Sequence, residues 1–119
     1  MRILFDSKQP QFKSPFGTLT PGEECTLHIH IPSSVQAKAV TCRIMSDDGS
    51  HTLEVAMEFQ KKLGAYDIFR GKFSLEACDL YFYYFYITTR TGGFSLYKVG
   101  DDTNMEAGDK WQVSCVPAD

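Results

Sequence analysis

The sequence predicts an all-β protein: an immunoglobulin-like β-sandwich of about seven or eight antiparallel strands. Short segments in which apolar and polar residues alternate follow one another along the chain, and turn-forming residues separate them. No segment longer than about ten residues shows the apolar period of about 3.6 residues that an amphipathic helix requires. A chain of 119 residues has the usual size of one domain, so residues 1–119 are expected to share a single core.

The first three strands are expected at residues 25–31, 40–45 and 52–59. In each segment apolar residues take every second position, which leaves one face for the core and one for solvent. Residues 32–34, Pro-Ser-Ser, end the first strand, and residues 46–49, Ser-Asp-Asp-Gly, form a polar turn after the second. The second and third strands are therefore expected to form a hairpin.

Residues 61–64, Lys-Lys-Leu-Gly, are predicted to be a loop, and the next strand follows at residues 69–75. Gly71 has the same parity as the apolar residues of this strand, so its missing side chain leaves room for a bulge or a close neighbour. The last strands are expected at residues 80–89, at residues 92–99 after a Gly-Gly pair, and at residues 111–115. The predicted core includes Leu27, Ile29, Val40, Ile44, Val55, Phe73, Phe85 and Trp111.

Composition and charge exclude several classes of partner. The formal net charge is -3, and no basic stripe of the kind that binds a phosphate backbone is present, so nucleic acid is not expected as a partner. No apolar run approaches the roughly 18 to 20 residues needed to cross a bilayer, so no membrane partner is expected. Residues 1–16 lack the pattern of a signal peptide, which favours a cytoplasmic location over secretion unless a leader has been removed.

The four cysteines have none of the spacings typical of zinc ligands. Three of them, Cys25, Cys42 and Cys115, alternate with core-type residues, so we expect unpaired thiols that pack as small apolar groups. A disulfide scaffold that also includes Cys78 is the weaker interpretation.

Two groups of residues carry side chains of the kinds that bind metal ions. His28 and His30 point to the same face of one strand, but two histidines without a third or fourth ligand make an incomplete metal site, so solvent-facing histidines are expected. Oxygen-bearing side chains of the kind that bind calcium also crowd one loop, although the loop lacks the register of an EF-hand. We expect a solvated acidic turn there, with calcium as the alternative; its candidate ligands are Asp101, Asp102, Asn104, Glu106 and Asp109.

No catalytic residue is predicted. The chain has no nucleophile motif of the G-x-S-x-G type, and nothing marks the pair of carboxylates, about 5 Å apart, that a retaining glycosidase needs. We therefore expect that the chain alone is not an enzyme and that it needs no cofactor.

The segment 80–87, Leu-Tyr-Phe-Tyr-Tyr-Phe-Tyr-Ile, is aromatic on both faces. We expect Tyr83, Phe85 and Ile87 to face the core, because the other set carries more hydroxyl groups that tolerate water. The outer set is then Phe82, Tyr84 and Tyr86. Two interpretations stay open for these rings. Either loops or another domain cover them, or they offer flat faces to the C–H surfaces of a sugar.

Three motifs, in order along the chain, resemble family 34 carbohydrate-binding modules. Residues 5–7 and 12–17 resemble the H-D-S and Y-x-S-P-F-G with which those modules begin, although Phe5 stands where the family has histidine. Residues 80–87 are similar to the family's L-Y-W-Y-Y-F-x-I strand, and residues 111–113 resemble its closing W-Q-L-T.

The resemblance implies an N-terminal module of a neopullulanase, cyclomaltodextrinase or maltogenic amylase, enzymes of glycoside hydrolase family 13 in the α-amylase superfamily. In that family an immunoglobulin-like module precedes a catalytic (β/α)8 barrel, none of whose motifs is in this chain. The expected partners are α-glucan or maltooligosaccharide, with Phe82, Tyr84 and Tyr86 as the sugar-contacting residues, and the barrel of the same enzyme. The alternative that stays open is a structural interdomain or homodimer-forming module with no affinity for sugar.

Overall fold

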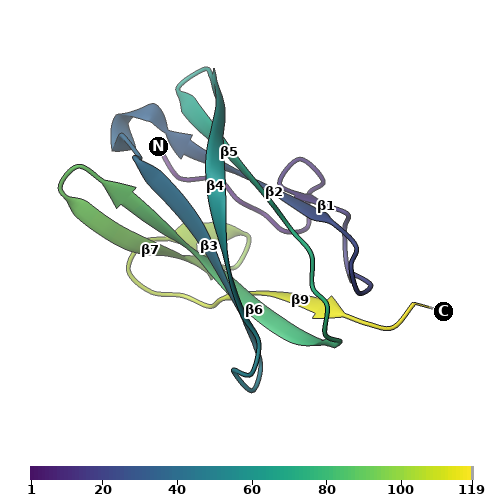
Figure 1. The fold of residues 1–119 in the computed structure, drawn as a ribbon. Coiled ribbons are helices and arrows are strands. Elements are labelled where there is room, and N and C mark those ends of the chain that lie inside the picture. Colours follow the sequence, from purple (N-terminus) through teal and green to yellow (C-terminus); the bar gives the residue numbers. More distant parts are fainter. Residues whose placement is uncertain (119) are drawn as a thin grey trace.

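The computed structural model describes residues 1–118, which form nine β-strands, one short 3-10 turn at Ser33–Val35 and no α-helix (Figure 1). Within these residues no helix is long and apolar enough to cross a membrane. The strands are β1 Lys13–Ser14, β2 Cys25–Pro32, β3 Ala39–Ser46, β4 Thr52–Leu63, β5 Tyr66–Phe73, β6 Asp79–Thr89, β7 Gly92–Val99, β8 Asp102–Asn104 and β9 Trp111–Cys115.

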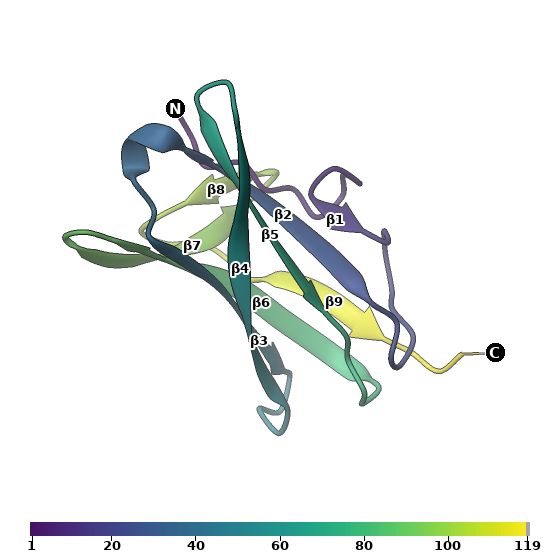
Figure 2. The same cartoon turned by 45° about the horizontal axis from the view of Figure 1, so that its top comes forward.

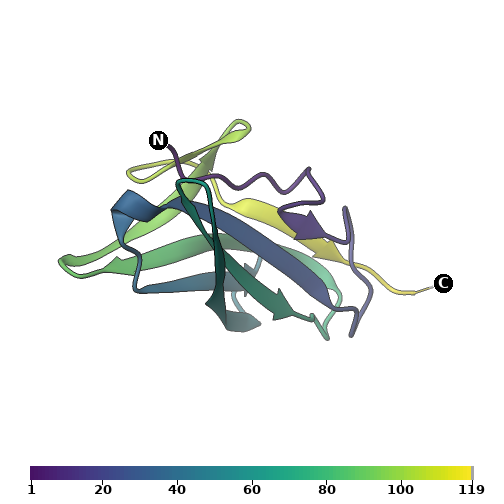
Figure 3. The same ribbon diagram turned by 90° about the horizontal axis from the view of Figure 1, so that it is seen from above.

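All the strand pairs are antiparallel, and the strands lie in two facing layers (Figures 1 and 3). Layer A contains β1, β2 and β5, and layer B contains β3, β6, β7 and β9. In layer B, β6 is central: β3 pairs with it from Tyr81 to Thr88, while β7 and β9 pair with its two ends on the other side (Figure 2). The predicted all-β sandwich is confirmed, with the short β1 and β8 added to seven longer strands.

Strand β4 belongs to both layers. Its first part, up to Met57, pairs with β3 of layer B, and its second part, from Glu58 to Leu63, pairs with β5 of layer A. The register shifts between Phe59 and Lys61, where the strand bulges. The prediction of a loop at residues 61–64 was therefore wrong for residues 61–63. The bulge lets the strand continue with a new partner, and the turn does not begin until Gly64.

A single apolar cluster fills the space between the layers, and all eight residues predicted for the core are buried in it. Gly71 stands at an inward-facing position of β5, and it has the close neighbour that the sequence predicted there. A Cβ atom at this position would lie 3.0 Å from Val55 Cγ1 and closer still to Met57 Sδ, so the missing side chain lets β4 pack over β5. Among residues 1–118 the four cysteines are free; Cys25, Cys42 and Cys115 are buried as predicted, and Cys78 is exposed.

Aromatic rings form the centre of the core. Phe5, from the segment before β1, packs edge-on against Phe85 and Trp111, with ring centroids 4.8 and 5.0 Å away. Tyr83 stacks on Trp111 with the ring planes 23° apart. Phe85 and Tyr83 are completely buried, whereas Phe82, Tyr84 and Tyr86 are only partly buried on the outer face of layer B. The predicted parity of the aromatic strand is therefore confirmed.

Candidate functional site

The outer face of layer B presents side chains in rows that run across its strands. The register of β3, β6 and β9 places Met45 and Gln112 on either side of Phe82. Arg43 lies beside Tyr84 in the next row along β6. Because paired residues of antiparallel strands project to the same side, each outer ring of β6 has a cross-strand neighbour on this face.

Tyr84 is surrounded by partners on this face. Its ring stacks on Tyr97 of β7 at 5.7 Å between centroids, with the planes 22° apart. The ammonium of Lys110, which directly precedes β9, lies 5.6 Å from the Tyr84 ring centroid. Arg43 Nη1 donates a hydrogen bond of 3.3 Å to the Tyr84 hydroxyl. The ring of Tyr84 is thus oriented by one aromatic and two cationic side chains.

Tyr86 is covered more tightly than its position on the outer face suggests. The guanidinium of Arg43 lies 4.7 Å from its ring centroid, within the range of a cation–π contact. Its ring also lies against Gly93 of β7, where a Cβ atom would come within 2.6 Å of Tyr86 Cζ. Glycine at this position therefore allows the Tyr86 ring to lie close against β7, with Arg43 over the ring.

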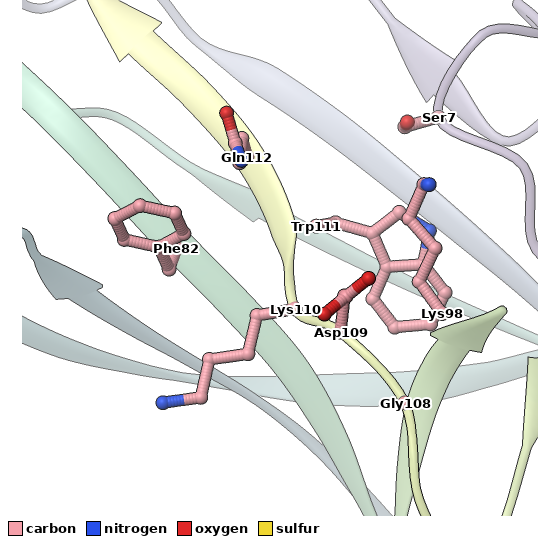
Figure 4. A pocket seen from close by; sticks show the side chains of 8 residues that line it. All are labelled: Ser7, Phe82, Lys98, Gly108, Asp109, Lys110, Trp111 and Gln112. Carbon is pink, nitrogen blue, oxygen red and sulfur yellow. The ribbon is translucent and has the colours of Figure 1, made fainter. Parts of the chain in front are cut away.

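Two hollows border Phe82. The smaller one, of about 190 Å³, lies toward β3 and β4 and is lined by Arg43, Met45, Leu53, Tyr84 and Lys110 as well as Phe82. The larger one, of about 790 Å³, lies toward β9 and is drawn in Figure 4. There Phe82 and Gln112 lie next to each other on β6 and β9, and Lys98 and Asp109 form the opposite side.

The electrostatics of the smaller hollow are mixed. Arg43 Nε lies 3.5 Å from Glu54 Oε2, and the pair is open to solvent. The hydrogen bond to the Tyr84 hydroxyl, assisted by Glu54, raises the pKa of Arg43, so this side chain keeps its positive charge at every physiological pH. The hollow therefore combines an aromatic floor with exposed hydrogen-bonding groups at its edge.

The structure places the three predicted sugar-contacting residues on one face but not in one environment. Phe82 and Tyr84 line the smaller hollow together, whereas Tyr86 lies outside it, beneath Arg43. Sequence reasoning missed Arg43, Lys110 and Gln112, which border the rings. Their parity placed Arg43 and Gln112 on the outer faces of their own strands, but only the register of β3 and β9 against β6 shows that they meet these rings.

The acidic loop does not gather its carboxylates into one cluster. Asp101 pairs with Lys8, which lowers the pKa of the Asp101 carboxyl, and Asp102 pairs with Arg2. The amide oxygen of Asn104 accepts hydrogen bonds from the backbone of Glu106 and Ala107, at 2.8 and 3.1 Å. Across residues 1–118 no three His, Cys, Asp or Glu side chains are placed to hold a metal ion together.

His28 and His30 lie on the outer face of layer A, where both are partly buried. His30 packs at 4.9 Å from the ring of Phe12, and His28 lies opposite Arg70 in the β2–β5 ladder. Burial lowers the pKa of both imidazoles; Arg70 adds to the effect at His28, and His28 adds to it at His30. Both histidines are therefore harder to protonate in the folded chain than in the unfolded one.

The domain is expected to lose stability as the pH falls below about 6.5, because the unfolded chain then binds protons that these histidines resist in the folded state. Above that pH both imidazoles are neutral in both states and contribute nothing. Solvent screening keeps the combined loss below about 1 kcal/mol. Urea unfolding at pH 7.5 and 5.5 measures it, and His28→Gln/His30→Gln should reduce the difference. An equal pH dependence in the double variant contradicts the assignment.

No protein-family model matches the chain, and no curated protein matches it. Its fold is similar to part of a solved structure, a cycloalternan-degrading enzyme from Trueperella pyogenes in complex with a covalent intermediate. The TM-score is 0.56, the sequences are 13% identical, and the match covers 92% of this chain. The chain spans only 17% of that enzyme's chain. This likeness shows the fold, which the enzyme uses as one part of a much longer protein.

Proposed function

We propose that the chain is a non-catalytic module of an α-glucan-hydrolysing enzyme and that it binds α-1,4 or α-1,6 glucan, or maltooligosaccharide, on the outer face of layer B. The observation that carries this proposal is the smaller hollow, in which Phe82 and Tyr84 lie among the exposed ends of Arg43 and Lys110. The motif resemblance and the likeness in fold to one part of a cycloalternan-degrading enzyme support it.

The chemistry of this face suits a sugar. The C–H groups on one side of a pyranose ring pack against an aromatic face, while its hydroxyl groups need donors and acceptors at the rim. Phe82 supplies the apolar surface, and Arg43, Glu54 and Lys110 supply charged hydrogen-bonding groups around it. A purely apolar patch of the same size would instead suit a protein partner.

A second candidate function is an interdomain or dimer-forming module, with the catalytic (β/α)8 barrel or a second copy of the enzyme as its partner. The part of β4 that pairs with β5 favours it, because Phe59, at the bulge, and Leu63, at the end of the strand, are both more than half exposed. Exposed apolar side chains on a hairpin strand are suited to packing against another folded surface. These residues do not line the smaller hollow, so the two functions use different residues and are compatible.

Maltotriose titrated into the chain is expected to shift NMR signals of layer B, with a dissociation constant between roughly millimolar and high micromolar, about -4 to -6 kcal/mol. The affinity is weak because a shallow hollow leaves much of the ligand hydrated. Tyr84→Ala/Tyr86→Ala is expected to abolish the shifts, since it removes one ring of the hollow and the ring that supports Arg43.

Tyr66→Ala is the matched control, because Tyr66 is a partly buried tyrosine of layer A, away from the hollow, and this variant should bind as the wild type does. Unchanged circular dichroism must accompany the double variant, so that lost binding is not lost folding. If the wild-type spectrum stays unchanged at about 10 mM maltotriose, the binding proposal is wrong and the interdomain or dimer function takes its place.

A further inference from the structure

Phe82 is the boundary between the two hollows of layer B. Both hollows are lined by Phe82 and Lys110, and they extend from these residues in opposite directions across the sheet. Met45 and Leu53 lie on the β3–β4 side, and Gln112 and Gly108 lie on the β9 side. The two hollows therefore adjoin each other at the ring of Phe82, and the larger one continues from there to Trp111 and to Ser7 of the N-terminal segment.

The register sets the length of this surface. Phe82 pairs with Met45 on one side and with Gln112 on the other, so the three side chains form one row across β3, β6 and β9. Neighbouring strands are about 4.8 Å apart, which makes the row about 10 Å long between the outer strands. One monosaccharide fills part of that length, whereas two or more linked sugars cover it.

The two sides of Phe82 offer different chemistry. Met45 and Leu53 are exposed apolar side chains that border its ring on the β3–β4 side. On the β9 side, the amide of Gln112, the ammonium of Lys98 and the carboxylate of Asp109 surround a larger and more open space (Figure 4). On one side of Phe82 the C–H face of a sugar ring would therefore pack against apolar atoms. On the other side the hydroxyl groups of the sugar would face hydrogen-bond donors and acceptors.

We infer that the two hollows are adjacent subsites for one linear oligosaccharide, with Phe82 and Lys110 shared between them, so that the site selects a chain of at least two sugars over a single one. The inference rests on the proposed function, because it assigns the ligand's length and direction at the same face. The oligosaccharide runs across the strands of layer B, from β3 and β4 over β6 to β9.

The test compares glucose, maltose and maltotriose on the whole 119-residue chain by NMR. The methyl groups of Met45 and Leu53 report on one hollow, and the side-chain amide of Gln112 and the backbone amide of Gly108 report on the other. Maltotriose is expected to shift both sets of signals with one dissociation constant and to bind at least about tenfold more tightly than glucose, a difference of about 1.4 kcal/mol.

Two variants separate the subsites. Gln112→Arg replaces the amide beside Phe82 with a longer, charged side chain that projects into the β9-side hollow, so the dissociation constant of maltotriose should rise to that of glucose while the Met45 and Leu53 methyl groups still shift. Gln60→Arg makes the same exchange at the exposed bulge of β4 and should leave the affinity for maltotriose unchanged.

Three outcomes decide the question. The inference is supported if maltotriose shifts the signals of both hollows with one dissociation constant and if Gln112→Arg removes the preference for maltotriose over glucose. Shifts confined to one hollow, with glucose bound as tightly as maltotriose, overturn the two-subsite inference and leave the proposed function standing. An absence of shifts with all three sugars at about 10 mM overturns both.

Discussion

Replacing Phe85 with alanine is expected to lower the free energy of unfolding by about 3 to 5 kcal/mol. The side chain is fully buried, and its ring lies 4.8 Å from that of Phe5 and 5.5 Å from that of Trp111. It also sits in the middle of β6, between Cys42 of β3 and Leu96 of β7. Truncation removes this apolar area from the core and leaves a cavity that two flanking strands and two fixed rings cannot fill.

Urea unfolding followed by tryptophan fluorescence measures this loss, because Trp111 is the only tryptophan and packs on Phe85. Phe59→Ala is the matched control: Phe59 is also a strand phenylalanine, but it is 52% exposed, so the loss should stay below about 1 kcal/mol. A loss below about 1 kcal/mol for Phe85→Ala itself contradicts the position assigned to this ring.

Phe5→Ala is expected to destabilise the domain by a similar amount, about 3 to 5 kcal/mol, although Phe5 precedes the first strand. Its side chain is 2% exposed, and its ring makes edge contacts with Phe12, Tyr83, Phe85 and Trp111. The segment around it is tied to β2 on both sides of Phe5: the backbone of Leu4 exchanges hydrogen bonds with that of His30, and the carbonyl of Phe12 accepts one from His28. Loss of the ring should therefore both open a cavity and loosen the N-terminal segment.

The control for Phe5→Ala is Phe16→Ala, because Phe16 belongs to the same N-terminal region but is 66% exposed, and its loss should stay within about 0.5 kcal/mol. Thermal unfolding by differential scanning calorimetry compares the two variants under one condition. Equal melting temperatures for Phe5→Ala and Phe16→Ala show that the N-terminal ring is not part of the core.

The longer strands and their inward faces were predictable because alternation is a local property. In β2, β3 and β6 the core residues occupy every second position, so one face of each strand can be read without knowing its partner. The parity of β6 was the hardest of these choices, since both sets are aromatic. The β-branched Ile87 and the hydroxyl groups of Tyr84 and Tyr86 decided it correctly.

Features that depend on contacts distant in sequence were not predictable. The pairing of residues 61–63 with β5 follows from the bulge in β4, which has no signature in the polar sequence Gln-Lys-Lys. The position of Phe5 is of the same kind. It stands where the resembling family has histidine, and only the fold shows that its environment is a cluster of four other aromatic rings.

The same distinction between local patterns and distant contacts applies to the candidate site. Phe82 and Tyr84 could be proposed from the sequence because an outer aromatic face on a central strand needs an explanation. The cover of Tyr86 by Arg43 and Gly93 could not, since it depends on which residues of β3 and β7 lie next to β6. The register therefore shifts attention from three equivalent rings to Phe82, the ring that borders both hollows.

Strand β4 ties the stability of the two layers together. Because one continuous strand donates and accepts backbone hydrogen bonds in both sheets, neither sheet can peel away as a unit without breaking pairs in the other. We therefore expect partial opening to begin at short edge strands such as β8, and the paired amides of β4 to exchange with solvent more slowly than those of β8. A ligand on layer B and a partner at the β4–β5 hairpin accordingly stabilise the same cooperative unit.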